Sequence, residues 1–258
     1  MNQLERRESI LKALLDDGQV LVKELALRFN TSEVTLRADL KALEKEGRLK
    51  RFFGGARPIQ TSPTYSEISP EVQIDKRYQI NADAKHRIAA KAATLVCPSD
   101  TIILDSGSTT HLVAKNLSSF RSNTIITNNL SACVALMDSE EITLVVIGGT
   151  YRTKTKSLHG HRAEQSLEGI QADVLFVGAD GLSPESGITT FNEGYAITEH
   201  MANSVKRVIA VVDSTKLGRV GFNKVLDSSR IHTLIIDDGI TPEEISEFES
   251  KGIEIIIA

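Results

Sequence analysis

The sequence lacks any apolar run of the roughly 20 residues that a membrane-spanning helix needs, and it has no charged-then-apolar signal segment near its start. We therefore expect no membrane association and a cytoplasmic location. Cysteine is scarce, because Cys97 and Cys133 are too few for a disulfide framework and fit a reducing compartment. With 258 residues, of which 41% are apolar and 25% charged, the composition is that of a globular protein of about two domains.

Positive charge is unevenly distributed along the chain. The net charge is −4, but residues 1–57 hold 12 lysines and arginines against 9 acids, a balance of +3, so the remainder carries −7. A basic segment joined to an acidic one favours contact with phosphate groups at one end only. A solvated charged surface is the alternative explanation of the same numbers.

The segment from Asn30 to Leu43 has the pattern of a DNA recognition helix. Ser32 is placed to cap the helix by accepting hydrogen bonds from backbone N–H groups of the first turn. Leucines at 36, 40 and 43 recur at helical spacing and predict one buried face. The N-terminal part of such a helix enters the major groove, where arginine reads guanine and small apolar groups touch thymine methyls. The residues we expect to contact DNA are Ser32, Glu33, Val34, Thr35, Arg37, Ala38 and Lys41.

Two helices are expected before this one and a hairpin after it. Apolar periodicity predicts helices at about 3–17 and 23–29, and Gly47 is placed to end the recognition helix. A cationic and aromatic stretch at 48–57 turns on two glycines, which favours a β-hairpin wing near DNA phosphates or the minor groove. A small helical bundle that only dimerises remains the alternative to a winged helix-turn-helix at 1–57. The expected wing contacts are Arg48, Lys50, Arg51 and Arg57.

Residues 58–80 are expected to form a linker, and residues 81–258 an α/β domain. Three prolines punctuate a stretch rich in serine and threonine. After it, β-branched runs alternate with helix-like segments at about 110–118, 129–138, 195–205 and 242–251, which predicts a doubly wound, largely parallel sheet covered on both faces. The expected strands are 101–104, 124–127, 142–147, 174–177, 208–212, 234–236 and 253–257.

A glycine-containing loop follows the first of these strands and precedes a helix. Ligands of open α/β sheets bind outside the carboxyl ends of the strands, and a helix N-terminus offers free N–H groups to an anion. A capped turn without a ligand has the same pattern, but small and polar residues also follow four other strands. The loop residues expected to bind an anionic ligand are Asp105, Ser106, Gly107, Ser108, Thr109 and Thr110.

The first 57 residues resemble the DeoR/GlpR family of bacterial repressors. The resemblance rests on Phe29-x-x-Ser32-x-x-Thr35-Leu36-Arg37-x-Asp39-Leu40, on Leu43-Glu44-x-x-Gly47-x-Leu49-x-Arg51 and on Gly54-Gly55-Ala56. Two positions depart from the family pattern: Ala38 replaces an arginine, and Phe53 replaces a histidine. These departures bear on the operator sequence and leave the predicted fold intact.

The second domain resembles the sugar-phosphate-sensing domain of the same family, which shares its fold with ribose-5-phosphate isomerases. The resemblance implies that Gly107, Ser108 and Thr109 hold a phosphate. The segments Leu158-x-Gly-x-x-Ala-Glu164 and Thr190-x-Asn192-Glu193 are most similar to AgaR-like regulators of amino-sugar and hexitol utilisation. By the same resemblance, further pocket residues are Asp105, Asn128, Arg152, Asp180, Glu193 and Lys216.

An enzyme is the alternative function. Asp180 and Lys216 are candidates for the base and the electrophile of a sugar-phosphate isomerase that carries an accessory DNA-binding segment. However, Gly181-Leu182 stands where the isomerases have a further acid, so we expect no catalysis. His159-Gly-His161 lacks a third ligand at a recognisable spacing, so we expect neither a metal site nor a cofactor.

The sequence therefore predicts a repressor of a sugar catabolic operon. We expect it to bind double-stranded operator DNA as a homo-oligomer, a dimer or a tetramer, because one winged domain contacts too few bases to recognise an operator specifically. A phosphorylated sugar bound to the second domain is expected to release the DNA.

Overall fold

The computed structural model describes residues 3–17, 19–52, 54–57, 72–191 and 197–258. The described residues up to Arg57 fall in one compact unit, which we call the winged-helix unit. Those from Val72 to Asp237 and from Pro242 to Ala258 fall in a second, the α/β unit. Of the helices in these described ranges, none is both long enough and apolar enough to cross a membrane.

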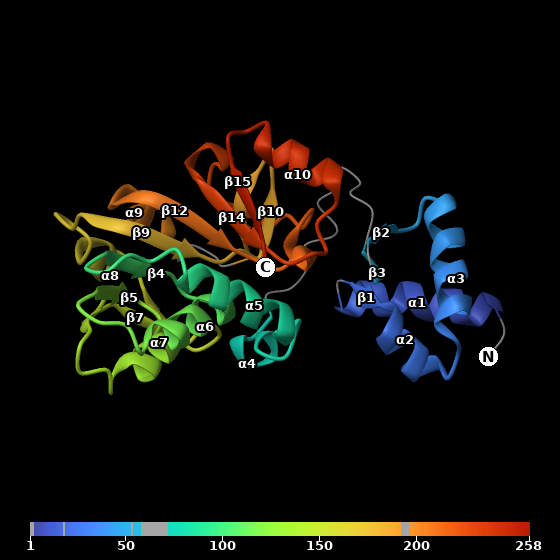
Figure 1. The fold of residues 1–258 in the computed structure, drawn as a ribbon, viewed down its shortest axis with the longest axis horizontal. Coiled ribbons are helices and arrows are strands. Elements are labelled where there is room, and N and C mark those ends of the chain that lie inside the picture. The colour runs from blue at the N-terminus through green and yellow to red at the C-terminus, as the bar shows by residue number, and fades with distance from the viewer. Residues whose placement is uncertain (1–2, 18, 53, 58–71, 192–196) are drawn as a thin grey trace. The chain divides into compact units, whose positions relative to one another are not determined.

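The winged-helix unit consists of three helices and a small antiparallel sheet (Figure 1). The sheet has the order β1-β3-β2, and Lys50 pairs with Arg57 across the hairpin of the wing. This arrangement confirms the predicted winged helix-turn-helix. Its elements are α1 (Gln3–Asp17), β1 (Val20–Leu21), α2 (Val22–Phe29), α3 (Glu33–Lys45), β2 (Lys50–Phe52) and β3 (Gly55–Arg57).

Helix α3 begins and ends where the sequence predicts. The Ser32 side chain accepts a hydrogen bond from the backbone N–H of Thr35, at 3.2 Å. Gly47 follows the helix with a φ of +68°, a left-handed conformation that suits glycine. The predicted apolar face is buried in a core that combines all three helices with the sheet: Ile10, Ala13, Leu14, Val20, Val22, Leu25, Leu36, Leu40, Leu43, Leu49 and Ala56.

A buried carboxylate joins α3 to α1. Asp39 is 1% exposed, and its two oxygens accept hydrogen bonds from Arg6 Nε at 2.6 Å and Arg7 Nε at 3.0 Å. Burial raises the pKa of Asp39, but the two guanidinium groups outweigh it and hold that pKa below its usual value. The paired arginines therefore fix the orientation of α3 relative to α1.

The α/β unit is built on a seven-stranded parallel sheet of order β15-β14-β12-β9-β4-β5-β6. The predicted strand positions are all occupied, with bounds that differ by a few residues. The strands are β4 (Thr101–Leu104), β5 (Thr124–Thr127), β6 (Thr143–Val146), β9 (Ala172–Val177), β12 (Val205–Val211), β14 (Thr233–Ile236) and β15 (Glu254–Ile257).

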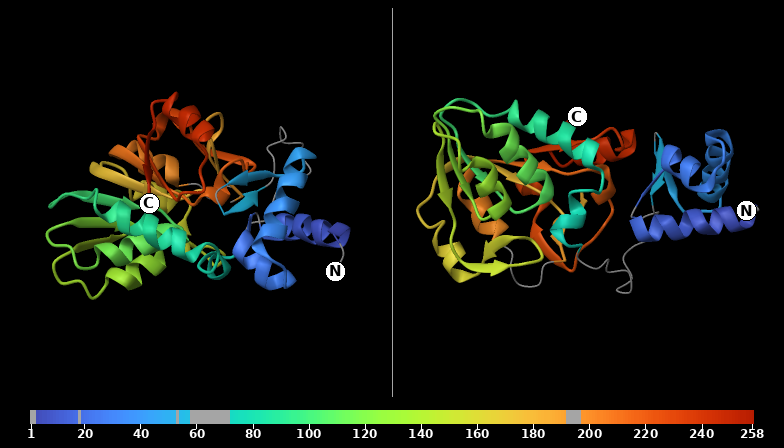
Figure 2. Two further views of the ribbon diagram at one scale, coloured as in Figure 1. Left: turned by 45° about the vertical axis from the view of Figure 1, so that its right-hand side comes forward. Right: turned by 90° about the horizontal axis from the view of Figure 1, so that it is seen from below.

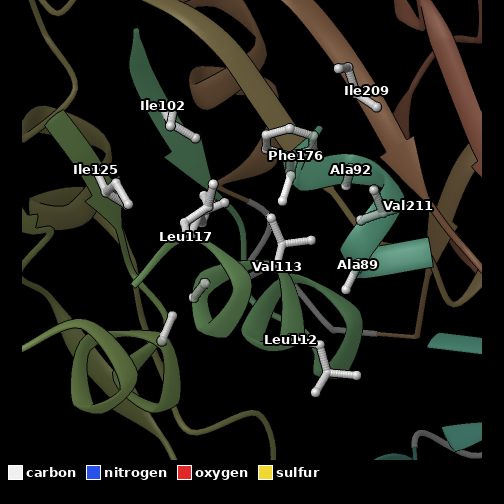
Figure 3. Close-up of a cluster of buried hydrophobic side chains, with 14 of the residues drawn as sticks. Ala89, Ala92, Ile102, Leu112, Val113, Leu117, Ile125, Phe176, Ile209 and Val211 are labelled. Carbon is white, nitrogen blue, oxygen red and sulfur yellow. The ribbon is translucent and has the colours of Figure 1, made fainter. Parts of the chain in front are cut away.

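Helices cover both faces of this sheet. On one face α5, α6 and α7 pack side by side, and Ile102, Phe176 and Val211 from neighbouring strands point into the core beneath them (Figures 2 and 3). The alternate residues Ile103 and Leu175 point to the other face and are also fully buried. The helices of the unit are α4 (Ile74–Arg77), α5 (Ala82–Ala93), α6 (Ser108–Leu117), α7 (Leu130–Leu136), α8 (His161–Gln165), α9 (Thr198–Asn203) and α10 (Pro242–Glu249), with 3₁₀ turns η1 (Ser214–Lys216) and η2 (Ser228–Arg230).

Two smaller sheets and helix α4 were not predicted. Strands β10 (Gly181–Ser183), β11 (Gly187–Thr190) and β13 (Asn223–Leu226) form an antiparallel sheet, and β7 (Thr150–Arg152) pairs with β8 (Ser157–His159). Helix α4 lies within the stretch 58–80 that we expected to be a linker. It belongs to the α/β unit because Ile74 N–H donates to the carbonyl of Lys154, at 2.9 Å.

The strand order creates a crevice beside β4. The chain runs from β4 outward to β5 and β6, and then returns to place β9 on the other side of β4. The connections that leave β4 and β9 therefore diverge at the carboxyl ends of adjacent parallel strands. Such a switch point is where open α/β sheets bind ligands.

We predict that Leu40→Ala lowers the free energy of unfolding of the winged-helix unit by about 2–5 kcal/mol, because it removes a fully buried side chain and leaves a cavity. Lys41→Ala, at the adjacent exposed position, should change it by about 0.5 kcal/mol or less. Urea denaturation followed by circular dichroism measures both. A cost below about 1 kcal/mol for Leu40→Ala would contradict the described packing.

Candidate functional site

Helix α3 presents an exposed face at its N-terminal end. Val34 is 77% exposed, and Arg37, Ala38 and Lys41 are exposed on the same side. A thymine methyl is an apolar partner for this exposed valine in the major groove. The face thus combines an apolar contact with cationic hydrogen-bond donors.

Arg37 is held in place by its own helix. Its Nη2 lies 2.9 Å from Glu33 Oε2, one turn earlier. Ser32 and Thr35 contact each other at the cap, with 2.8 Å between their hydroxyl oxygens. The expected DNA contacts of Ser32 and Thr35 would therefore compete with the cap, and those of Arg37 would compete with its ion pair to Glu33.

The wing offers fewer free cations than the sequence suggested. Arg48 is exposed and Lys50 is half-buried. The side chain of Arg51 pairs with Glu44 of α3, with 2.7 Å between Nε and Oε2, so it fixes the wing against the helix. Arg57 is 5% exposed, and its expected phosphate contact does not fit this burial.

The pocket of the α/β unit lies at the carboxyl ends of β4, β9 and β12. The loop after β4 forms one side, and the antiparallel sheet with the β7–β8 connection contributes further walls. The lining residues are Arg77, Lys85, Asp105, Ser106, Gly107, Ser108, Thr109, Thr155, His159, Gly178, Ala179, Asp180, Ile188, Thr189, Thr190, Thr198, Val211, Val212, Asp213, Lys216 and Val225.

The loop after β4 leads directly into α6. Gly107 precedes the helix in an extended conformation, and a Cβ added there would meet Thr110 Oγ1 at 3.3 Å. The first intrahelical bond runs from His111 N–H to the carbonyl of Gly107, so the earlier N–H groups point out of the helix end. With the hydroxyls of Ser108 and Thr109 on the pocket wall, this loop is suited to an anion.

Asp105 sits at the base of this loop and is 6% exposed. Burial raises its pKa to about 6, although hydrogen bonds from Thr198 Oγ1, at 2.7 Å, and Ser106 N–H, at 2.6 Å, oppose the shift. Asp180 raises that pKa further by like-charge repulsion. The carboxyl is therefore poised to donate or accept a proton near neutral pH.

Two other acids are held in the charged form by cations. Burial raises the pKa of Asp180, but Arg77 and Lys216 outweigh it and hold the pKa below its usual value. Asp213 is buried in the same way, and Lys216 and Lys85 hold its pKa low. Burial lowers the pKa of Lys216 to about 8, against the attraction of Asp213. The pocket thus contains three acids and three cations that depend on one another.

Among the described residues, three expected ligand residues do not line the pocket. Thr110 is fully buried, and its hydroxyl donates to the carbonyl of Gly107 at 3.1 Å. Asn128 is buried too, and its Nδ2 donates to the carbonyl of Leu158 at 3.0 Å, so it holds strand β8. Arg152 lies on β7 and is not among the lining residues, and Glu193 falls outside the described residues.

The sequence patterns missed several lining residues. Arg77 and Lys85 precede the first strand, in a stretch taken as linker and helix, and nothing in their spacing marks them as pocket residues. Asp213 follows strand β12 and belongs to the polar strand ends that the sequence did reveal. Thr155 and His159 come from a hairpin that was not predicted.

His159 and His161 contact other side chains of the protein. His159 Nε2 lies 2.7 Å from the hydroxyl of Ser157, in the buried interior, and His161 is exposed near Glu164. Within the described ranges, no three His, Cys, Asp or Glu side chains form a cluster that could hold a metal ion.

Comparison with known proteins identifies both units. Residues 6–62 match the DeoR-like helix-turn-helix domain, and residues 80–238 match the DeoR C terminal sensor domain. A protein of Escherichia coli O157:H7 named for repression of the aga operon is 35% identical over 98% of this chain and 93% of its own length. The lactose phosphotransferase system repressor of Lactococcus lactis is 33% identical over 96% of both chains.

Among solved structures, ribose 5-phosphate isomerase A of Methanocaldococcus jannaschii is similar over 53% of this chain and 55% of its own, with 22% identity and a TM-score of 0.40. This likeness is too distant to bear on function. The two domain models and the relatives that match along the whole chain are decisive, and this chain belongs to the DeoR family of helix-turn-helix transcriptional regulators.

Proposed function

We propose that the protein represses a sugar-utilisation operon and that a phosphorylated sugar in the pocket of the α/β unit releases it from DNA. The observation that supports this most strongly is the presence in one chain of an exposed reading face on α3 and a polar pocket beside a helix N-terminus. Each feature suits one of the two ligands.

The reading face suits direct contact with base edges. Arg37 offers two parallel donors to a guanine, and Val34 and Ala38 suit thymine methyls. Glu33, beside Arg37, is placed to accept from a cytosine amino group. Lys41 and the wing residues Arg48 and Lys50 are then the candidates for contacts with DNA phosphates. Arg51 pairs with Glu44, and Arg57 is buried, so we assign neither of them to DNA.

The pocket suits a phosphorylated polyol. The loop at 106–109 offers hydroxyls and helix N–H groups to a phosphate. Asp105 at the base of this loop and Asp180 after β9 can accept hydrogen bonds from sugar hydroxyls, and Lys216 adds positive charge to the pocket. An uncharged sugar would leave the helix N-terminus unused, so the phosphate distinguishes the ligand from its unmodified precursor.

We propose that two or more copies bind one operator. A single α3 reads only a few base pairs, and a second copy on a neighbouring half-site multiplies both affinity and selectivity. The name of one relative, the lactose phosphotransferase system repressor of Lactococcus lactis, supports a ligand from sugar metabolism.

The isomerase alternative has lost its support. The family and the relatives that match are transcriptional regulators, so the chain is a regulator and not an enzyme. The pocket agrees with this, because Arg77 occupies the carboxylate of Asp180, which an isomerase would need as a free base.

A gel-shift titration tests the proposal. DNA duplexes selected by the full chain from a random pool supply the operator, and glucose 6-phosphate, glucosamine 6-phosphate and fructose 6-phosphate are then added. We expect one of them to weaken binding to the selected duplex about 10-fold or more, and its unphosphorylated sugar to have no effect. Selective DNA binding that none of the three alters would contradict the proposed ligand class.

Substitutions in the reading face and the wing should act differently. Arg37→Ala should cost about 1–3 kcal/mol on the selected duplex and relax selectivity at one base pair. Lys50→Ala should weaken all duplexes alike and reduce the salt dependence of binding by about one phosphate contact. Binding to a set of single-base variants at several salt concentrations measures both. Unchanged selectivity in Arg37→Ala would show that α3 is placed differently on DNA.

Removing two hydroxyls from the pocket loop should lower the affinity for the ligand and leave the affinity for DNA unchanged. The double variant Ser108→Ala, Thr109→Val should keep operator affinity, but lose about 10-fold or more in affinity for the releasing sugar phosphate, because hydrogen bonds to a charged group disappear. Ser118→Ala, at the other end of α6, is the control. Normal release in the double variant would place the phosphate elsewhere.

A further inference from the structure

Helix α4 is the first part of the α/β unit that follows the winged-helix unit in the described chain. It is fastened to the turn between β7 and β8: Ile74 N–H donates to the carbonyl of Lys154, and Lys156 Nζ lies 2.6 Å from Asp75 Oδ1. Thr155, in the middle of that turn, lines the pocket. The position of α4 is therefore tied to the pocket wall.

The side chain of Arg77 spans the distance from the pocket to the beginning of α4. Its Nη2 lies 2.8 Å from Asp180 Oδ1, and its Nε donates at 2.8 Å to the carbonyl of Val72. The side chains of this ion pair are 15% and 9% exposed. One guanidinium thus holds a pocket acid through Nη2 and, through Nε, the backbone that leads in sequence towards the DNA-binding unit.

A second pocket acid holds the other end of the same segment. Lys85 Nζ donates at 2.7 Å to the carbonyls of both Arg77 and Ile80, and it lies 3.9 Å from Asp213 Oδ2. Asn81 Nδ2 donates to Asp213 Oδ1 at 2.9 Å. Because Lys85 is 2% exposed, these contacts are shielded from water, and the turn between α4 and α5 depends on the charge balance of the pocket.

We propose that Arg77 couples the pocket to the DNA-binding unit. A phosphorylated ligand forms hydrogen bonds with the guanidinium or with Asp180 in place of part of their ion pair, and the contact between Arg77 and Val72 changes as a result. This inference rests on the proposed function and adds its route of regulation. A phosphate dianion competes well for arginine, because paired charge-assisted hydrogen bonds to a guanidinium are strong.

The planar shape of the guanidinium makes the two contacts dependent on each other. Its donors project in fixed directions, so a rotation that improves one contact misaligns the other. The remaining oxygen of Asp180 already accepts from Thr190 Oγ1 at 2.8 Å and Phe191 N–H at 3.2 Å, so the carboxylate is fixed and the arginine is the partner that moves. Ligand binding is thereby transmitted to the backbone at residue 72.

The test compares Arg77→Lys and Arg77→Gln with Lys76→Gln in the full chain. Lys76 is exposed on the same helix, so its substitution removes the same charge without touching the pocket. The measured quantity is the ratio of operator dissociation constants with and without a saturating amount of the sugar phosphate that releases the original protein. Calorimetry gives the ligand affinity of each variant, and thermal denaturation shows whether it is folded.

We expect the ratio to fall from about 10 or more to about 2 or less in both Arg77 variants, and to be unchanged in Lys76→Gln. The ratio compares each variant with itself, so a change in operator affinity without ligand does not enter it, and ligand affinity should change less than about 10-fold because the loop at 106–109 is intact. By reciprocity, operator DNA should weaken ligand binding to the original protein and not to the Arg77 variants. Arg77→Lys keeps a cation opposite Asp180, so it carries the test if Arg77→Gln does not fold.

Two results with these variants would overturn the inference. A full release ratio in Arg77→Lys would show that the bridge to Val72 is dispensable. Loss of ligand binding as complete as the loss of release would make Arg77 a ligand contact only. Failure of every sugar phosphate to release the original protein would instead defeat the proposed function, and this outcome is recognised without any variant.

Discussion

The structure of the α/β unit depends on the pairing of charges that are buried at one end of its sheet. Asp180 and Asp213 meet Arg77, Lys85 and Lys216 where β9 and β12 end, and each of these charges would be costly to bury alone. Their pairing draws α4, the start of α5 and the turn η1 into a single arrangement. A ligand that brings its own negative charge must rearrange these pairs, and we propose that this rearrangement is the signal.

The winged-helix unit uses a buried charge in a different way. Asp39 is fixed by two arginines of α1, and α3 thereby keeps one orientation while Val34 and Arg37 remain exposed on the other side. Here the buried carboxylate gives rigidity. The reading surface is therefore prepared in advance, and we infer that ligand control acts on the placement of the whole unit and not on the shape of α3.

Local sequence patterns were sufficient to predict much of this fold and part of the candidate site. The cap at Ser32, the apolar spacing of α3 and the β-branched strands specify their elements directly, and the loop after β4 follows from the rule for open α/β sheets. Patterns could not reveal that Arg57 is buried or that Arg77 reaches the pocket, since both depend on contacts between distant segments. Helix α4 has only four residues, too few for a periodic signal, in a stretch whose prolines and hydroxyl residues indicated a linker.

Hydrogen exchange of the full chain tests the central claim most directly, by comparing the protein with and without the sugar phosphate that releases it. The account predicts that backbone amides at 72–81 change their exchange rates along with the loop at 105–110, because Arg77 and Lys85 connect them. Changes confined to the loops after β4 and β9, with residues 72–81 unaffected, would contradict it.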